Sequence, residues 1–70
     1  MDLAQAVDIA TNFIETKGGY TTHYLRNTKY DNITEQWELI FDVGLFMAIS
    51  IKIMIDDKEG KVISYERLTS

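Results

Sequence analysis

The sequence contains no cysteine, no proline and a single histidine among its 70 residues. Without cysteine, disulfide bonds, thiolate catalysis and cysteine-based zinc sites are all excluded. One histidine, His23, is too few for a histidine-rich metal site within one chain. Chains this short usually depend on a disulfide, a metal or a partner subunit for their stability. Of these three, the composition favours the partner subunit.

Basic residues are also scarce, with seven Lys and Arg against eleven Asp and Glu and a formal net charge of −4. An acidic chain repels the phosphate backbone, so nucleic acid is not an expected partner. With 46% hydrophobic residues and a modest net charge, the chain should nevertheless fold. Its length suits one domain over residues 1–70.

Long hydrophobic runs are missing as well. The longest apolar stretch, Val43 to Ile55, is interrupted by Ser50 and Lys52, and a bilayer span needs about 20 apolar residues. The first residues have neither the basic segment nor the apolar run of a signal peptide. We therefore expect a soluble, cytoplasmic protein that has no membrane partner.

The N-terminal segment has apolar residues at spacings of three and four, the pattern of an amphipathic helix. These residues are Leu3, Ala6, Val7, Ala10, Phe13 and Ile14. A helix over residues 3–17 would begin with a capping box of Asp2 and Gln5 and end at Gly18 and Gly19. Ile9 lies off this stripe and either widens it or is exposed.

Four strand segments follow. Residues 20–30 are aromatic or β-branched but weakly patterned, which predicts an edge strand. Residues 37–43 and 49–55 alternate apolar and polar, residues 56–60 predict a hairpin loop, and residues 62–68 predict the last strand. We therefore predict an α+β fold with one N-terminal helix packed on a four-stranded antiparallel meander sheet. Its predicted core consists of Leu3, Val7, Ala10, Phe13, Ile14, Trp37, Leu39, Phe41, Ile51, Ile53 and Ile63.

Three segments of the second half carry a resemblance to a known group of domains. They are Trp37–Gly44, which reads WELIFDVG, Lys52–Asp56, which reads KIMID, and Gly60–Tyr65, which reads GKVISY. With the preceding helix they resemble PepSY-like and cystatin-like small α+β domains. The resemblance implies a sheet that wraps against the helix and a non-catalytic role. One departure is the link Gly44–Ala48, which is apolar here and usually polar in that group.

No residue pattern predicts catalysis. His23 has no nucleophile motif around it, and we interpret it as a surface histidine on a strand. Glu35, Glu38 and Asp42 could supply paired carboxylates. Glu38 and Asp42, however, lie about 13 Å apart along one strand, which is too far for a glycosidase pair. We expect no enzymatic activity and no cofactor.

Two binding motifs are matched only in part. Asp56, Asp57 and Glu59 precede Gly60 as in a calcium loop, but the first ligand position would fall on Ile55. We therefore interpret them as a solvated hairpin tip and expect no metal. The aromatic residues around the first strand could stack on single-stranded nucleic acid, but such platforms need a basic groove that this acidic chain lacks. These residues are Tyr20, Tyr24, Tyr30 and Trp37.

Leu45, Phe46 and Met47 form an apolar run where a polar turn is expected. They belong either to an interface or to the core of a longer strand pair. We expect a non-catalytic protein-interaction module that forms a homodimer, or binds another protein, with Leu45, Phe46 and Met47 as its interface. The alternative is a small-ligand-binding domain with a pocket between helix and sheet, near Trp37 and the tyrosines.

Overall fold

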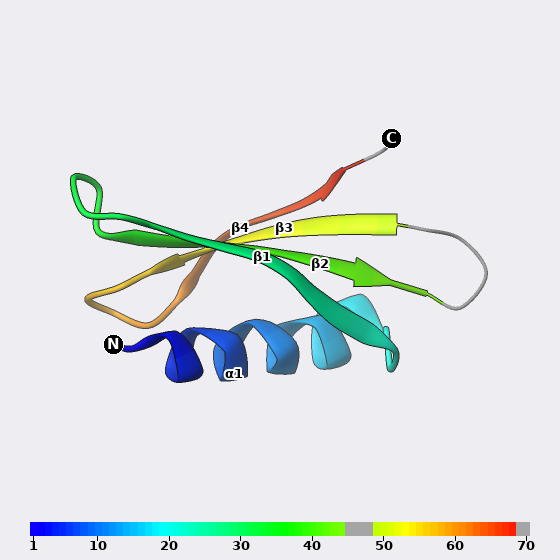
Figure 1. Cartoon of the computed structure of the whole chain (residues 1–70). Coiled ribbons are helices and arrows are strands. Elements are labelled where there is room, and N and C mark those ends of the chain that lie inside the picture. Colours follow the sequence, from blue (N-terminus) through cyan, green and yellow to red (C-terminus); the bar gives the residue numbers. More distant parts are fainter. Residues whose placement is uncertain (45–48, 69–70) are drawn as a thin grey trace.

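The computed structural model describes residues 1–44 and 49–68 of the chain. Its elements are α1 (Leu3–Phe13), the π-helical turn η1 (Ile14–Gly18), β1 (His23–Asp31), β2 (Gln36–Val43), β3 (Ile49–Asp56) and β4 (Val62–Leu68). The strands pair antiparallel in the order β1-β2-β3-β4, and α1 lies against one face of this sheet (Figure 1). The predicted α+β fold with a meander sheet is confirmed.

Both predicted ends of the helix are confirmed. The Gln5 backbone N–H donates to Asp2 Oδ1 at 2.9 Å, and the Asp2 N–H donates to Gln5 Oε1 at 3.0 Å, which completes a capping box. At the other end Gly19 has a φ of 74°, a left-handed conformation that favours glycine. The last turn differs from the prediction of a uniform helix, because it widens to a π-helix in which the Gly19 N–H donates to the Ile14 carbonyl oxygen.

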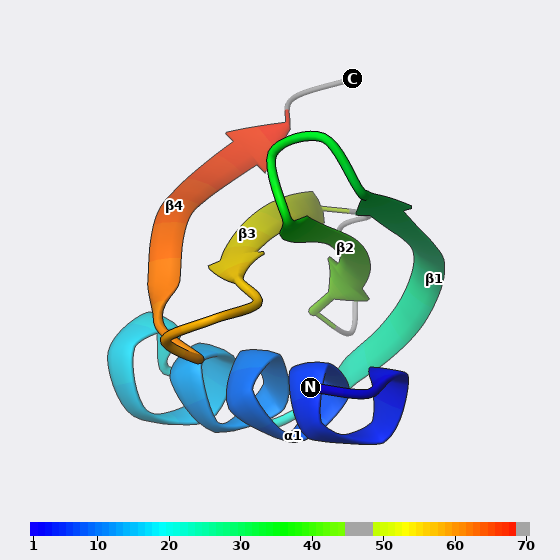
Figure 2. The same cartoon turned by 90° about the vertical axis from the view of Figure 1, so that its left-hand side faces the viewer.

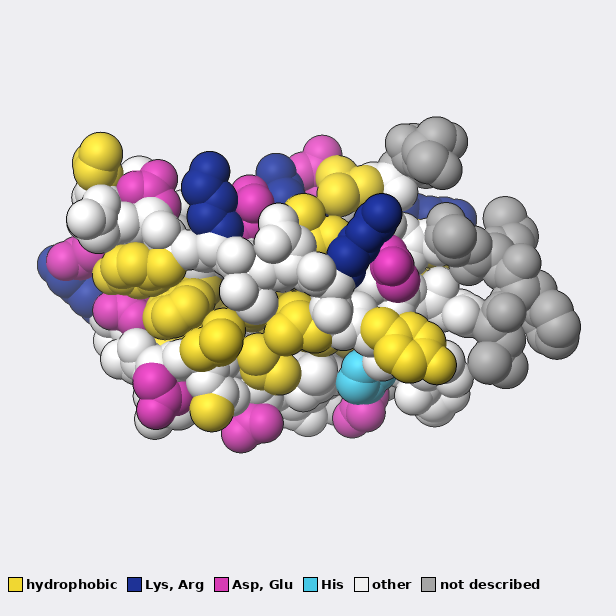
Figure 3. Space-filling model, viewed as in Figure 1, with side chains coloured by type: hydrophobic (Ala, Val, Ile, Leu, Met, Phe, Trp, Pro, Cys, Tyr) yellow, Lys and Arg dark blue, Asp and Glu magenta, His cyan; other side chains and the backbone are white. Residues whose placement is uncertain are grey.

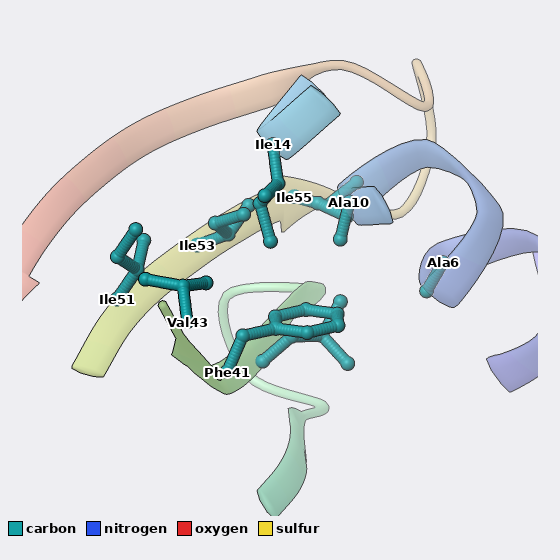
Figure 4. Close-up of a cluster of buried hydrophobic side chains, with 9 residues drawn as sticks. Ala6, Ala10, Ile14, Phe41, Val43, Ile51, Ile53 and Ile55 are labelled. Carbon is teal, nitrogen blue, oxygen red and sulfur yellow. The ribbon is translucent and has the colours of Figure 1, made fainter. Parts of the chain in front are cut away.

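The core lies between α1 and the inner face of the sheet (Figure 4). Alternate residues of β2 and β3 point toward the helix, as the alternation of residue types predicts. The helix contributes two alanines, whose small side chains allow it to approach the strands closely. The buried residues are all at most 2% exposed; they are Ala6, Ala10, Ile14, Leu39, Phe41, Val43, Ile51, Ile53 and Ile55.

The predicted core is largely confirmed. The fully buried members of the prediction are Ala10, Ile14, Leu39, Phe41, Ile51 and Ile53. Val7, Phe13 and Trp37 are partly buried against this cluster, and Ile9 joins them, so it widens the helix stripe.

The prediction that Leu3 and Ile63 belong to the core was wrong. Leu3 is substantially exposed although it shares the helix stripe of Ala10 and Ile14; it is the first residue of α1 and lies at the end of the helix. Ile63 is half exposed, because the pairing register shifts there: Ile55 pairs with Val62 and Met54 with Ser64, which leaves Ile63 in between. An extra residue of this kind breaks the inward–outward alternation.

The sheet curls around the helix, with β1 and β4 as its two edges (Figure 2). The predicted edge position of the first strand is therefore confirmed. The β1–β2 turn and the β3–β4 turn lie at the same end of the molecule as the N-terminus (Figure 1). The two turns are joined by a hydrogen bond from the Asp57 N–H to the Glu35 carbonyl oxygen (2.9 Å) and by the Lys58–Glu35 ion pair (3.0 Å).

Candidate interaction surface

The helix covers the sheet unevenly. α1 packs against β2, β3 and β4. One flank of the helix faces β4, where the Phe13 ring lies 5.2 Å from that of Tyr65. With 100° between successive residues, Val7 lies about 120° around the helix from Phe13, on the opposite flank, toward β1.

The inner side of β1 is consequently left partly uncovered. Leu25 pairs with Phe41 and Tyr30 pairs with Trp37, so both belong to the face of the sheet that bears the core. Yet Leu3, Leu25 and Tyr30 are 41–42% exposed. We call this region the α1–β1 surface; it consists of Leu3, Val7, Leu25, Tyr30 and Trp37. Figure 3 shows a band of hydrophobic side chains on this side of the molecule.

The aromatic part of the α1–β1 surface is held in place. The Trp37 indole N–H donates to Asp57 Oδ1 at 2.9 Å, and the Tyr30 ring lies 4.8 Å from the Trp37 ring at an angle of 50°. Partial desolvation, followed by the nearby carboxylates of Asp57, Glu35 and Asp31, raises the pKa of Tyr30. These contacts restrict the freedom of the two rings, so little side-chain entropy would be lost if the rings were covered.

The charged side chains of β1 and of the helical segment lie outside the α1–β1 surface. On β1, Arg26 and Lys29 are exposed on the outer face of the sheet: Lys29 pairs with Glu38, and Arg26 lies 3.5 Å from Asp42 on β2. On α1, Asp8 is exposed beside the β3–β4 loop, and beyond α1 the exposed Glu15 contacts His23. In Figure 3, Lys and Arg side chains rise above the hydrophobic band, and Asp and Glu side chains gather below it along the helix.

His23 is less exposed than the sequence predicted. Its side chain is 19% exposed and packs edge-on against Phe41, with ring centroids 6.1 Å apart. His23 Nε2 lies 3.1 Å from Glu15 Oε2, so the pair joins the end of the helical segment to the start of β1. This arrangement holds the two elements that border the α1–β1 surface.

Two of the carboxylates considered for catalysis, Glu38 and Asp42, lie on the outer face of the sheet, among basic and hydroxyl groups, whereas Glu35 lies in the β1–β2 turn. Lys52 Nζ lies 4.0 Å from Glu38 and 3.6 Å from Glu66. Asp42 accepts a hydrogen bond from Ser50 Oγ at 2.9 Å. These networks give the outer face its polar character, in contrast to the apolar band around α1.

The acidic loop between β3 and β4 is a hairpin tip, as predicted. Asp56 Oδ2 accepts from the Glu59 N–H at 2.7 Å, and Gly60 adopts a φ of 66°. Strands flank this loop, and among residues 1–44 and 49–68 no three His, Asp or Glu side chains are grouped to hold a metal ion.

Two open hollows flank this hairpin. One, of about 500 Å³, lies between the loop and the start of α1; the other, of about 580 Å³, lies beside Val62 and Ile63. Charged loop residues line both of them, including Lys58 and Glu59, whereas ligand pockets are mostly apolar. The ligand pocket predicted near Trp37 and the tyrosines stays a prediction.

The predicted interface residues Leu45, Phe46 and Met47 lie outside the described residues. The exposed side chains of Leu3, Leu25 and Tyr30 were missed by the sequence analysis, although one signal could have found them. An α-helix with side chains is about 10 Å wide, which is narrower than four strands spaced about 4.8 Å apart. One helix therefore leaves part of such a sheet uncovered.

No helix in the described part of the chain is long and apolar enough to cross a membrane. The small α+β fold is established, while its resemblance to PepSY-like and cystatin-like domains is not supported by a family match. No family model matches this chain, and no curated protein or solved structure matches it.

Proposed function

We propose that this protein is a non-catalytic protein-interaction module that self-associates through the α1–β1 surface. The observation that carries the proposal is that Leu3, Leu25 and Tyr30 remain 41–42% exposed on the core side of the sheet. Apolar area removed from water contributes about 25 cal/mol per Å². A partner that covered this surface would extend the small core of the domain.

The size of the chain supports the same proposal. In a 70-residue chain, the gain from apolar burial and the loss of conformational entropy nearly cancel on a first estimate. Association adds stability, because a partner that binds only the folded chain shifts the folding equilibrium toward it.

The polar groups of His23 and Trp37 are hydrogen-bonded within the fold, which supports a structural role for both side chains. His23 is bound to Glu15 and packs on Phe41, while the Trp37 indole is bound to Asp57. Each of these contacts joins two elements of the fold.

Sedimentation velocity on the wild type and on a matched pair of variants tests the proposal. Leu25→Gln changes the α1–β1 surface, whereas Tyr24→Gln changes the neighbouring exposed residue on the opposite face of β1. We expect the wild type and Tyr24→Gln to sediment at twice the chain mass at micromolar concentrations and Leu25→Gln to sediment as a monomer. A monomeric wild type throughout that range, or equal behaviour of the two variants, would overturn the proposal.

A further inference from the structure

The turn between β3 and β4 reaches the aromatic part of the α1–β1 surface through the side chain of Asp57. Asp57 Oδ1 accepts the hydrogen bond of the Trp37 indole N–H at 2.9 Å, and the Tyr30 ring packs 4.8 Å from the Trp37 ring. An indole N–H can only donate, and a partly buried one needs an acceptor. The acceptor here belongs to a turn that is not part of the surface itself.

Asp57 is held in place by its own contacts. The two turns lie at the same end of the molecule (Figure 1), where the Asp57 backbone N–H donates to the Glu35 carbonyl oxygen at 2.9 Å and Lys58 Nζ lies 3.0 Å from Glu35 Oε2. The Met1 amino group lies 3.7 Å from Asp57 Oδ1. Glu35 has a φ of 57°, a strained conformation for a residue other than glycine, which persists only where its surroundings hold it. These contacts fix the Asp57 carboxylate beside the Trp37 ring.

Loss of this acceptor would affect both rings of the surface. Trp37 is only half-buried and Tyr30 is 41% exposed, so the core alone does not lock either ring. An indole N–H without its acceptor would turn toward water, and Tyr30 would lose the ring on which it packs. Rings that move freely lose more side-chain entropy when a partner covers them, which weakens binding.

We propose that Asp57 is a positioning residue for the α1–β1 surface: it fixes the Trp37 and Tyr30 rings through the indole hydrogen bond, and self-association therefore depends on the β3–β4 turn. This proposal rests on the proposed function and adds a residue outside the surface that controls it. The relevant property of Asp57 is its acceptor oxygen, so an amide at this position should serve almost as well as a carboxylate.

The indole signal tests the positioning role directly. Trp37 is the one tryptophan of the chain, so a ¹H–¹⁵N correlation spectrum contains a single indole N–H signal. Asp57→Ala removes the acceptor, Asp57→Asn keeps one, and Glu59→Ala removes a carboxylate of the same turn that lies 3.9 Å from Lys61. We expect the signal to move in Asp57→Ala and to stay close to its wild-type position in the other two variants. A signal that Asp57→Ala leaves in place would overturn the positioning role.

Sedimentation velocity on the same variants tests the effect on association. Asp57→Ala should raise the dimer dissociation constant several-fold, whereas Asp57→Asn and Glu59→Ala should dimerise like the wild type. Both Asp57 variants lose the ion pair with the Met1 amino group, so rescue by asparagine assigns the effect to the hydrogen bond and not to the charge.

Trp37→Phe removes the same hydrogen bond from its donor side and leaves Asp57 unchanged. It should weaken dimerisation, and Asp57→Ala should weaken it no further in this background, because the two residues act through one contact. If Asp57→Ala does not fold, Trp37→Phe alone decides, and a Trp37→Phe protein that dimerises like the wild type would overturn the proposal.

The two proposals fail in different ways. A wild type that sediments as a dimer together with an equally dimeric, folded Asp57→Ala protein would overturn the role of Asp57 alone. A wild type that is monomeric throughout the micromolar range would overturn the proposed function, and with it the dependence of association on Asp57.

Discussion

Phe41 is the largest of the fully buried side chains. Truncation of such a residue removes its transfer free energy and leaves a cavity that the surroundings fill only in part. We expect Phe41→Ala to lower the free energy of unfolding by about 3–5 kcal/mol, as measured by urea denaturation. That loss would be a large part of the stability of a small domain.

Ile33 provides the control for this variant. It is 90% exposed at the β1–β2 turn. Exposed substitutions usually change stability by less than about 0.5 kcal/mol, so Ile33→Ala should unfold at nearly the wild-type urea concentration. Similar losses for Phe41→Ala and Ile33→Ala would contradict the core described above.

Asp31 links the stability of the β1–β2 turn to pH. Its Oδ1 accepts hydrogen bonds from the backbone N–H groups of Ile33 at 2.9 Å and Thr34 at 3.3 Å, and these bonds hold its pKa below the ordinary value of 3.8. The folded-state pKa is therefore lower than the unfolded one. The resulting stabilisation is present above pH 3.8 and is lost as the pH falls through the folded-state pKa.

We expect Asp31→Asn to flatten this acid dependence, because asparagine keeps an acceptor oxygen but does not titrate. Thermal unfolding between neutral and strongly acidic pH measures the effect. An unchanged difference between the two pH limits would show that other carboxylates account for the acid sensitivity.

At the residue scale, the alternating pattern was sufficient to predict Leu39, Phe41, Ile51 and Ile53 as buried. The same reasoning failed at Ile63, because an extra residue in β4 reverses the alternation and nothing in the local residue types marks its position.

At the scale of elements, two glycines in the left-handed conformation allow two effects of an added side chain to be measured apart. One effect is backbone strain, and the other is a close contact with a neighbouring side chain. Gly60 and Gly19 have φ values of 66° and 74°. A Cβ at Gly60 would lie 3.2 Å from Met1 Cε, whereas the described structure has no atom within 4 Å of a Cβ at Gly19. Gly19→Ala should therefore lower the free energy of unfolding through backbone strain alone, by about 1–2 kcal/mol.

Gly60→Ala should cost at least as much as Gly19→Ala, because Met1 must also shift. Paired thermal melts of the two variants measure the difference. A Gly60→Ala protein as stable as the wild type would contradict the left-handed conformation of the β3–β4 turn.

The candidate surface was less predictable than the elements that form it. Residue types predict that Leu25 and Tyr30 belong to a strand, but whether a helix covers them depends on how α1 crosses a twisted sheet. That crossing is set by contacts between distant segments. The apolar run Leu45–Met47, which the sequence does mark, lies outside the described residues.

At the scale of the whole molecule, self-association would make thermal stability depend on protein concentration. We expect the melting temperature of the wild type to rise with concentration, because the dimer forms only from folded chains. Leu25→Gln disrupts the α1–β1 surface, so its melting temperature should be the same at every protein concentration. Differential scanning calorimetry over a wide concentration range makes the comparison, and a constant wild-type melting temperature would argue against a stable dimer.

The meander order of the strands also affects how the chain reaches its fold. Each strand pairs with its neighbour in the sequence, so most of the sheet is built from contacts of short sequence separation. Folding rates rise as the contacts become more local. The chain contains no proline, so refolding lacks the slow phase that cis–trans isomerisation at proline causes. The docking of α1 onto β3 and β4 joins segments far apart in the sequence, and it is therefore the step that should limit the folding rate.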